Sequence, residues 1–111
     1  MTQKEEFNKK REEQNEILLE KADLTLKRFM SLDTQAYKEG ALQPKTKEML
    51  GLVASLVLRC DDCIKYHIIQ CHESGVEEDE LMEALAIGVV VGGSITVPHV
   101  RRAVKFWGEL E

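Results

Sequence analysis

Two cysteines and a histidine stand close together in the middle of this chain, in the run Cys60-Asp-Asp-Cys63-Ile-Lys-Tyr-His67. Apolar residues recur at helical spacing after Cys63, and neither glycine nor proline occurs before Gly75, so the run is predicted to be helical. At about 100° per residue, the side chains of Cys60, Cys63 and His67 then fall within about 60° of one another on one face. Two thiols and an imidazole on one face are the components of a dithiol redox centre.

A cysteine is a nucleophile only as its thiolate, and an ordinary thiol with a pKa of about 8.5 is only slightly ionised at neutral pH. Cys60 and Cys63 fall in the first turn of the expected helix, where free N–H groups and the helix dipole favour the anion. His67 lies one turn beyond Cys63 and is placed to take a proton from the sulfur or to hydrogen-bond it. Asp61 and Asp62 oppose a thiolate by like charge, but both project away from the sulfur face, so we expect a small penalty. A thiolate oxidised by peroxide becomes a sulfenic acid that the neighbouring thiol converts to a disulfide, so peroxide reduction fits this arrangement.

The pattern of apolar residues predicts an all-α fold of about five to six helices in a single domain, residues 1–111. Residues 1–16 are mostly charged and are expected to form an N-terminal arm or a solvated helix. A helix over residues 17–32 is expected to be amphipathic. The next helix begins at Pro44, which suits a first turn, and continues through Val57; it is apolar nearly all round, which favours a buried central position.

Glycines mark the ends of the later helices. Gly75 is expected to end the cysteine-bearing helix, since glycine is the usual residue just past a helix C-terminus. Acidic residues 77–80 favour the N-terminus of another helix through the dipole, and Gly92-Gly93 ends or interrupts it. A last helix runs to about Trp107.

Composition excludes several classes of function. No apolar run reaches the roughly 18–20 residues of a membrane span, and the charged start is not a signal peptide, so we expect a cytoplasmic protein without a membrane partner. The net charge of −5 argues against a nucleic-acid partner, because phosphate binding needs a basic surface. Three cysteines are an odd number and do not suggest a disulfide framework; in a reducing compartment a CxxC pair is typical of catalysis or metal binding.

A glutamate twelve residues before Cys60 extends the motif to Glu-x11-Cys-x2-Cys-x3-His. Its context is Pro44-Lys-Thr-Lys-Glu48 on one side, and Gly75 followed by acidic residues and Leu81-Met-Glu-Ala-Leu on the other. This pattern resembles the alkyl hydroperoxidase D branch of the carboxymuconolactone decarboxylase family. The resemblance covers about residues 22–109 and is strongest over residues 44–93, the region of the redox motif.

The resemblance implies that Cys63 is the peroxidatic cysteine and Cys60 the resolving one, and that His67 and Glu48 form a proton relay. It also implies an all-helical homo-oligomer, a trimer or hexamer, that needs no metal or other cofactor. The expected function is a thiol-dependent peroxidase or dithiol oxidoreductase, with a hydroperoxide as substrate and a dithiol reductant or reducing protein as partner. The best-studied members carry a histidine immediately before the second cysteine, where this chain has Asp62. The efficiency of peroxide reduction and the identity of the reductant therefore stay open.

Zinc is an alternative interpretation, because Cys71 extends the stripe to four potential ligands with Cys60, Cys63 and His67. On a straight helix, Cys60 and Cys71 are separated by about 16 Å. Tetrahedral zinc needs all four donors within about 2.0–2.3 Å of the ion. We therefore expect Cys71 to be a small buried apolar residue instead.

Two further functions stay open beside the peroxidase. One is a redox-sensing or partner-binding dithiol protein without turnover, which the Asp62 departure and the short chain allow. The other is a decarboxylase-like lyase in which His67 acts as general acid or base. His72 is expected at the surface and His99 in a structural role, and a solvated basic face is expected from Arg101, Arg102 and Lys105.

Overall fold

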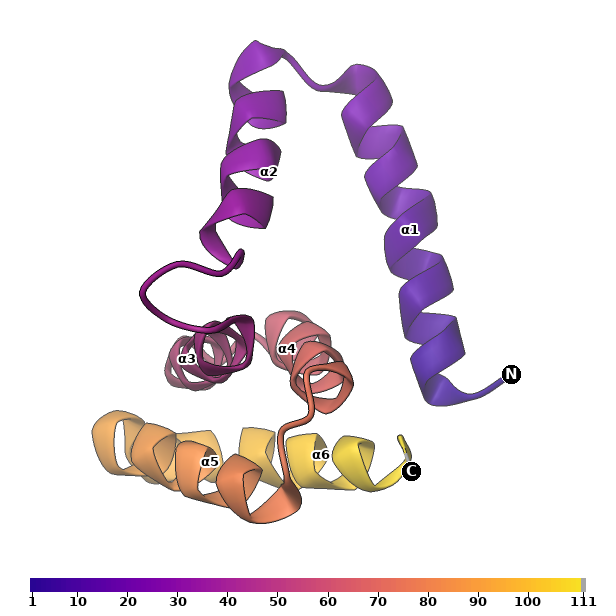
Figure 1. Cartoon of the computed structure of the whole chain (residues 1–111). Coiled ribbons are helices and arrows are strands. Elements are labelled where there is room, and N and C mark those ends of the chain that lie inside the picture. The colour runs from indigo at the N-terminus through magenta and orange to yellow at the C-terminus, as the bar shows by residue number, and fades with distance from the viewer. Residues whose placement is uncertain (111) are drawn as a thin grey trace. The chain divides into compact units, whose positions relative to one another are not determined.

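The computed structural model describes residues 1–110, which contain six α-helices, one short 3₁₀ helix and no β-strand (Figure 1). The elements follow in the order α1 (Gln3–Lys21), α2 (Leu24–Ala36), α3 (Pro44–Val57), α4 (Asp61–Glu73), α5 (Glu78–Gly92), η1 (Ser94–Thr96) and α6 (Val97–Gly108). The predicted all-α class is confirmed. The chain divides into two compact units, Met1–Lys38 and a second unit that begins at Glu39. Within residues 1–110, no helix combines the length and the apolar character needed to cross a lipid bilayer.

The first unit consists of α1 and α2, and neither helix contains a buried residue. The continuous helix expected over residues 17–32 is interrupted, because α1 ends at Lys21 and Asp23 is the N-cap of α2. The Asp23 carboxylate accepts a hydrogen bond from the Leu26 N–H at 2.9 Å, which is the preferred role of aspartate at a helix start. Both helices leave large apolar side chains exposed, namely Ile17, Leu18, Leu19, Leu24, Leu26, Phe29 and Leu32.

The second unit is built around α3, which packs against both α4 and α5, while α6 packs against α4. Figure 1 shows α3 and α4 lying over α5 and α6, so this unit has two layers of helices. The core between the layers is aliphatic apart from two aromatic residues of α6. Its buried apolar side chains include Leu52, Leu56, Ile64, Ile68, Ile69, Leu81, Leu85, Ala103, Phe106 and Trp107.

Helices α3 and α5 approach closely at Gly88, where an added Cβ would lie 2.6 Å from Cδ2 of Leu56. The expectation that α3 is buried on all sides is wrong for one face, since Leu50 is 55% exposed. That face and α5 border an open groove of about 830 Å³ with mainly apolar walls. The groove is lined by Thr46, Met49, Leu50, Val53, Ala54, Glu80, Glu83, Ala84, Ala86 and Ile87.

The glycines end the later helices as predicted. Ser74 is the C-cap of α4, and Gly75 follows it with a φ of 85°, a conformation that costs glycine little. Gly93 ends α5 with a φ of 86°. Pro98 lies in the first turn of α6, where the missing N–H has no helical partner to lose.

Candidate functional site

The two cysteines of the CxxC motif lie at the N-terminus of α4. The helix begins at Asp61, and Cys60 is its N-cap rather than a helical residue. Cys60 and Cys63 are joined as a disulfide with their Cα atoms 5.3 Å apart. The Cys63 N–H also donates a hydrogen bond to Cys60 Sγ at 3.2 Å. Cys60 is half-buried and Cys63 is exposed, so a reagent from solvent can reach the pair through Cys63.

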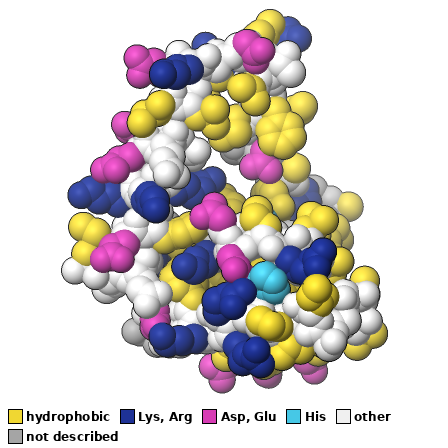
Figure 2. Space-filling view, turned by 180° about the vertical axis from the view of Figure 1, so that it is seen from behind, with side chains coloured by type: hydrophobic (Ala, Val, Ile, Leu, Met, Phe, Trp, Pro, Cys, Tyr) yellow, Lys and Arg dark blue, Asp and Glu magenta, His cyan; other side chains and the backbone are white. Residues whose placement is uncertain are grey.

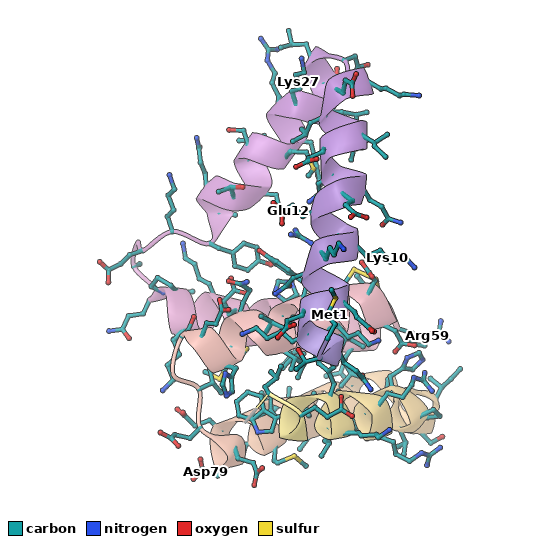
Figure 3. All side chains as sticks on the ribbon, turned by 90° about the vertical axis from the view of Figure 1, so that its right-hand side faces the viewer. Met1, Lys10, Glu12, Lys27, Arg59 and Asp79 are labelled. Carbon is teal, nitrogen blue, oxygen red and sulfur yellow. A yellow bond between two sulfur atoms is a disulfide. The ribbon has the colours of Figure 1, made fainter. Side chains whose placement is uncertain are left out.

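A tight connection between α3 and α4 places Cys60 at this position. Leu58 caps α3, and the Cys60 N–H donates to the Ser55 carbonyl oxygen at 3.1 Å. Arg59, labelled in Figure 3, adopts a φ of 59°, which among residues 1–110 is the one positive φ outside glycine. Positive φ is uncommon for a residue with a side chain and costs free energy, so the cysteine pair follows a locally strained turn.

Glu48 of α3 and His67 of α4 meet in the interior beside this connection. Glu48 is 6% exposed and His67 is 7% exposed, and Glu48 Oε2 lies 2.9 Å from His67 Nδ1. Burying either group alone would be costly, whereas together they satisfy each other's hydrogen bonds. Because Nδ1 lies against Glu48, this contact holds the orientation of the imidazole ring.

The structure thus brings together the four residues singled out by the sequence motif. Cys60 and Cys63 share the first turn of α4, and His67 follows Cys63 by one helical turn on the same helix. Glu48 joins them from the preceding helix. An exposed sulfur pair, backed by a buried carboxylate–imidazole pair, can carry out thiol chemistry that needs proton transfer.

Cys71 lies on α4 but is fully buried in the core. Burial raises the pKa of its thiol to about 12, and the nearby charge of Glu48 adds to this effect. Cys71 is therefore kept in the unreactive thiol form. Within residues 1–110, no three His, Cys, Asp or Glu side chains are grouped so as to hold a metal ion.

We expect Cys71 in the reduced native protein to resist iodoacetamide at pH 8. A thiol with a pKa of about 12 is ionised there to only about one part in ten thousand, and burial also denies access. Labelling followed by peptide mass spectrometry should find Cys71 unmodified in the native state and modified after unfolding in guanidinium. Labelling of Cys71 at the rate of Cys63 in the native protein would contradict this assignment.

Sequence reasoning missed a polar cluster that joins the start of α4 to α6. Asp61 Oδ1 lies 2.7 Å from His99 Nδ1, and Asp61 Oδ2 accepts a hydrogen bond from Arg102 Nη2 at 3.0 Å. Partial burial raises the pKa of Asp61, but the hydrogen bonds and charges of His99 and Arg102 outweigh burial and hold it below its ordinary value. Arg102 is thus not merely a solvated side chain. His72 is half-buried, with its ring edge-on to Trp107 at 5.1 Å between centroids.

Residues 23–106 match the carboxymuconolactone decarboxylase family, and the chain belongs to that family. A Thermotoga maritima protein is 53% identical and superposes with a TM-score of 0.93 over 95% of this chain and 92% of that chain. A second crystal structure of that protein, with 52% identity and a TM-score of 0.91, describes it as a family member for which a role in the antioxidative response has been suggested.

More distant relatives also match this chain. A carboxymuconolactone decarboxylase family protein of Legionella pneumophila is 25% identical, with a TM-score of 0.86 over 96% of this chain and 95% of that chain. An uncharacterised protein from the cox locus of Paracoccus denitrificans is 23% identical over 75% of this chain and 75% of its own length. The family assignment therefore agrees with both sequence and structure.

Proposed function

We propose that this protein is a thiol-dependent peroxidase of the alkyl hydroperoxidase D type. The observation that carries the proposal is the exposed Cys60–Cys63 pair at the start of α4, one helical turn from the buried Glu48–His67 pair. A peroxidase needs an accessible thiolate, a second thiol within bonding distance and a route for protons. This arrangement supports all three requirements without calling on a metal or cofactor.

The proposed reaction has three balanced steps. The Cys63 thiolate attacks the distal oxygen of a hydroperoxide, forming a sulfenic acid and releasing an alkoxide, which takes a proton to become an alcohol. The Cys60 thiol then attacks the Cys63 sulfur, forming the disulfide and releasing water. A dithiol reductant attacks the disulfide, restores both thiols and leaves as its own disulfide.

In this proposal, Glu48 and His67 handle the protons. Glu48 holds His67 by Nδ1 and stabilises positive charge on the ring, so that Nε2 takes a proton from a thiol and later returns it to the departing oxygen, directly or through water. Because His67 is on the same helix as Cys63, their separation changes little during the cycle. Asp62 stands where related enzymes carry a histidine, so in this chain the relay depends on His67.

Two further features support an antioxidant enzyme that acts as a homo-oligomer. The Thermotoga maritima relative, for which an antioxidative role has been suggested, is more than half identical to this chain. The open apolar groove between α3 and α5 is the kind of surface that a second subunit covers in a trimer or hexamer. We propose such an assembly, working in the reducing cytoplasm with a dithiol or a reducing protein as electron donor.

The direct test is turnover by the wild-type protein. Reduced protein mixed with one equivalent of an alkyl hydroperoxide should form the Cys60–Cys63 disulfide, with Cys71 still a thiol in the peptide map. With excess dithiothreitol or a lipoyl dithiol, peroxide should then be consumed catalytically. Disulfide formation without catalytic consumption would instead support a redox sensor. An absence of reaction with peroxide would reject the proposal.

A further inference from the structure

One carboxylate beside the cysteine pair is held by two basic side chains. Asp61 directly follows Cys60 and precedes Cys63 by two residues, so it shares the first turn of α4 with both sulfurs. His99 Nδ1 contacts one of its oxygens at 2.7 Å and Arg102 Nη2 contacts the other at 3.0 Å. Arg102 Nη2 also lies 3.2 Å from His99 Nδ1, so the three groups form one compact cluster.

The neighbouring carboxylate, Asp62, is not ion-paired in this way in the described part of the chain. Asp62 is exposed, and among residues 1–110 no ion pair involves it. The basic partners of Asp61 come from the first turns of α6, about forty residues further along the chain. Figure 2 shows Lys and Arg side chains gathered around a histidine on one face of the molecule. The fold therefore places positive charge specifically against the carboxylate that adjoins Cys60.

This placement matters because a thiolate and a carboxylate in one helical turn repel each other. An unneutralised Asp61 would oppose the help that the N-terminal N–H groups give to the thiolate. A guanidinium in contact with the carboxylate cancels most of this repulsion at the sulfurs. The two opposite charges together produce only the weaker field of a dipole. The two contacts also restrain the Asp61 side chain.

We propose that Arg102, together with His99, is a positioning residue that neutralises Asp61 and so keeps the Cys60–Cys63 thiols reactive at neutral pH. The role deepens the proposed function and rests on it, because a low thiol pKa is useful only where the thiolate attacks a substrate. Arg102 acts through Asp61 and touches neither sulfur nor substrate in this account.

The first experiment compares Arg102→Ala with Arg101→Ala in the fully reduced protein. Arg101 is exposed on the same helix and makes no ion pair with Asp61, so the two variants lose the same charge. The rate of alkylation by iodoacetamide, measured from pH 5 to 10, gives the pKa of the reactive thiol. We expect Arg102→Ala to raise this pKa and to slow alkylation at pH 7 about two- to threefold, with Arg101→Ala unchanged. In about 1 M salt the difference should shrink, because the cluster is partly exposed.

The second experiment separates charge from structure. In Asp61→Asn/Arg102→Ala, the carboxylate that Arg102 neutralises is absent, so the alkylation rate should return towards wild type, whereas loss of a structural contact would not be repaired. Asp61→Asn alone should lower the thiol pKa less than Asp62→Asn, because Asp61 is in an ion pair with Arg102. This comparison stays informative if Arg102→Ala folds poorly, which circular dichroism would show.

Equal thiol pKa values in the Arg102→Ala and Arg101→Ala proteins would overturn the inference, as would a double variant no faster than Arg102→Ala. These measurements use no peroxide, so they are separable from the proposed function. An unchanged pKa with normal peroxide turnover rejects the role of Arg102 and leaves the peroxidase standing. If Arg102→Ala shifts the thiol pKa as expected but the wild-type protein does not turn over peroxide, Arg102 does influence the thiols. The peroxidase proposal is then rejected, and Arg102 has no role in catalysis.

Discussion

Cys63→Ser is expected to reduce hydroperoxide consumption to the uncatalysed background, a loss of about a hundredfold or more. Cys63 is exposed at the N-terminus of α4, whereas Cys60 is half-buried and occupied as the helix cap. A serine hydroxyl keeps the size of the side chain but is not ionised at neutral pH, and oxygen cannot form the sulfenic acid. Steady-state peroxide loss with excess dithiol, monitored in the wild-type and variant proteins, measures the effect.

Two other cysteine variants serve as controls. Cys60→Ser should still react once with peroxide and then stop or slow, because the sulfenic acid on Cys63 has no neighbouring thiol to resolve it. Cys71→Ala should keep its activity, since the buried thiol is un-ionised and much less reactive than the exposed pair. If Cys63→Ser consumed peroxide as fast as wild type, Cys63 would not be the nucleophile and the proposed mechanism would be wrong.

Glu48→Gln is expected to have the second-largest effect, lowering peroxide turnover about 10- to 100-fold. Glutamine keeps the shape of the side chain and can accept the hydrogen bond from His67 Nδ1, but it removes the carboxylate charge that would stabilise the ring during proton transfer. The relay between His67 and the thiol should then be less effective. The measurement is kcat/KM for the hydroperoxide at neutral pH with excess reductant, compared between the wild-type and variant proteins.

Glu78→Gln is the matched control, because Glu78 is an exposed first-turn glutamate of α5 in the same unit, lies outside the groove lining and loses the same charge when replaced. Chemical unfolding of both proteins would show whether Glu48→Gln has altered the fold. A harsher change, Glu48→Ala, leaves a buried imidazole without its partner and should cost about 1–3 kcal/mol of stability. A Glu48→Gln protein with the wild-type kcat/KM would remove Glu48 from the relay.

Local patterns were sufficient to predict the helices of the second unit. Pro44, Gly75 and Gly93 act through backbone restrictions that belong to the residue itself, so their effect can be read without knowing the fold. The Glu48–His67 pair was expected only because a spacing matched a family motif. Nothing in the helical period of α3 alone distinguishes Glu48 from an exposed first-turn glutamate.

The features that could not be predicted depend on distant parts of the chain or on rare conformations. Asp61 meets Arg102 across forty-one positions, and no local pattern encodes which helix faces which. Arg59 adopts the left-handed conformation, which a sequence usually indicates by a glycine at that position. The break before α2 depends on Asp23, whose capping role competed with an apolar pattern that continued on both sides.

The sulfur of Cys60 is both a redox-active atom and the cap of a helix. It occupies the place of a capping oxygen and accepts the Cys63 N–H at 3.2 Å. A thiolate there is a charged acceptor at the positive end of the helix dipole, whereas a disulfide sulfur is neutral and accepts weakly. We therefore expect the Cys63 N–H to be bound more strongly by Cys60 in the reduced protein than in the disulfide, so that reduction of the pair strengthens the cap of α4.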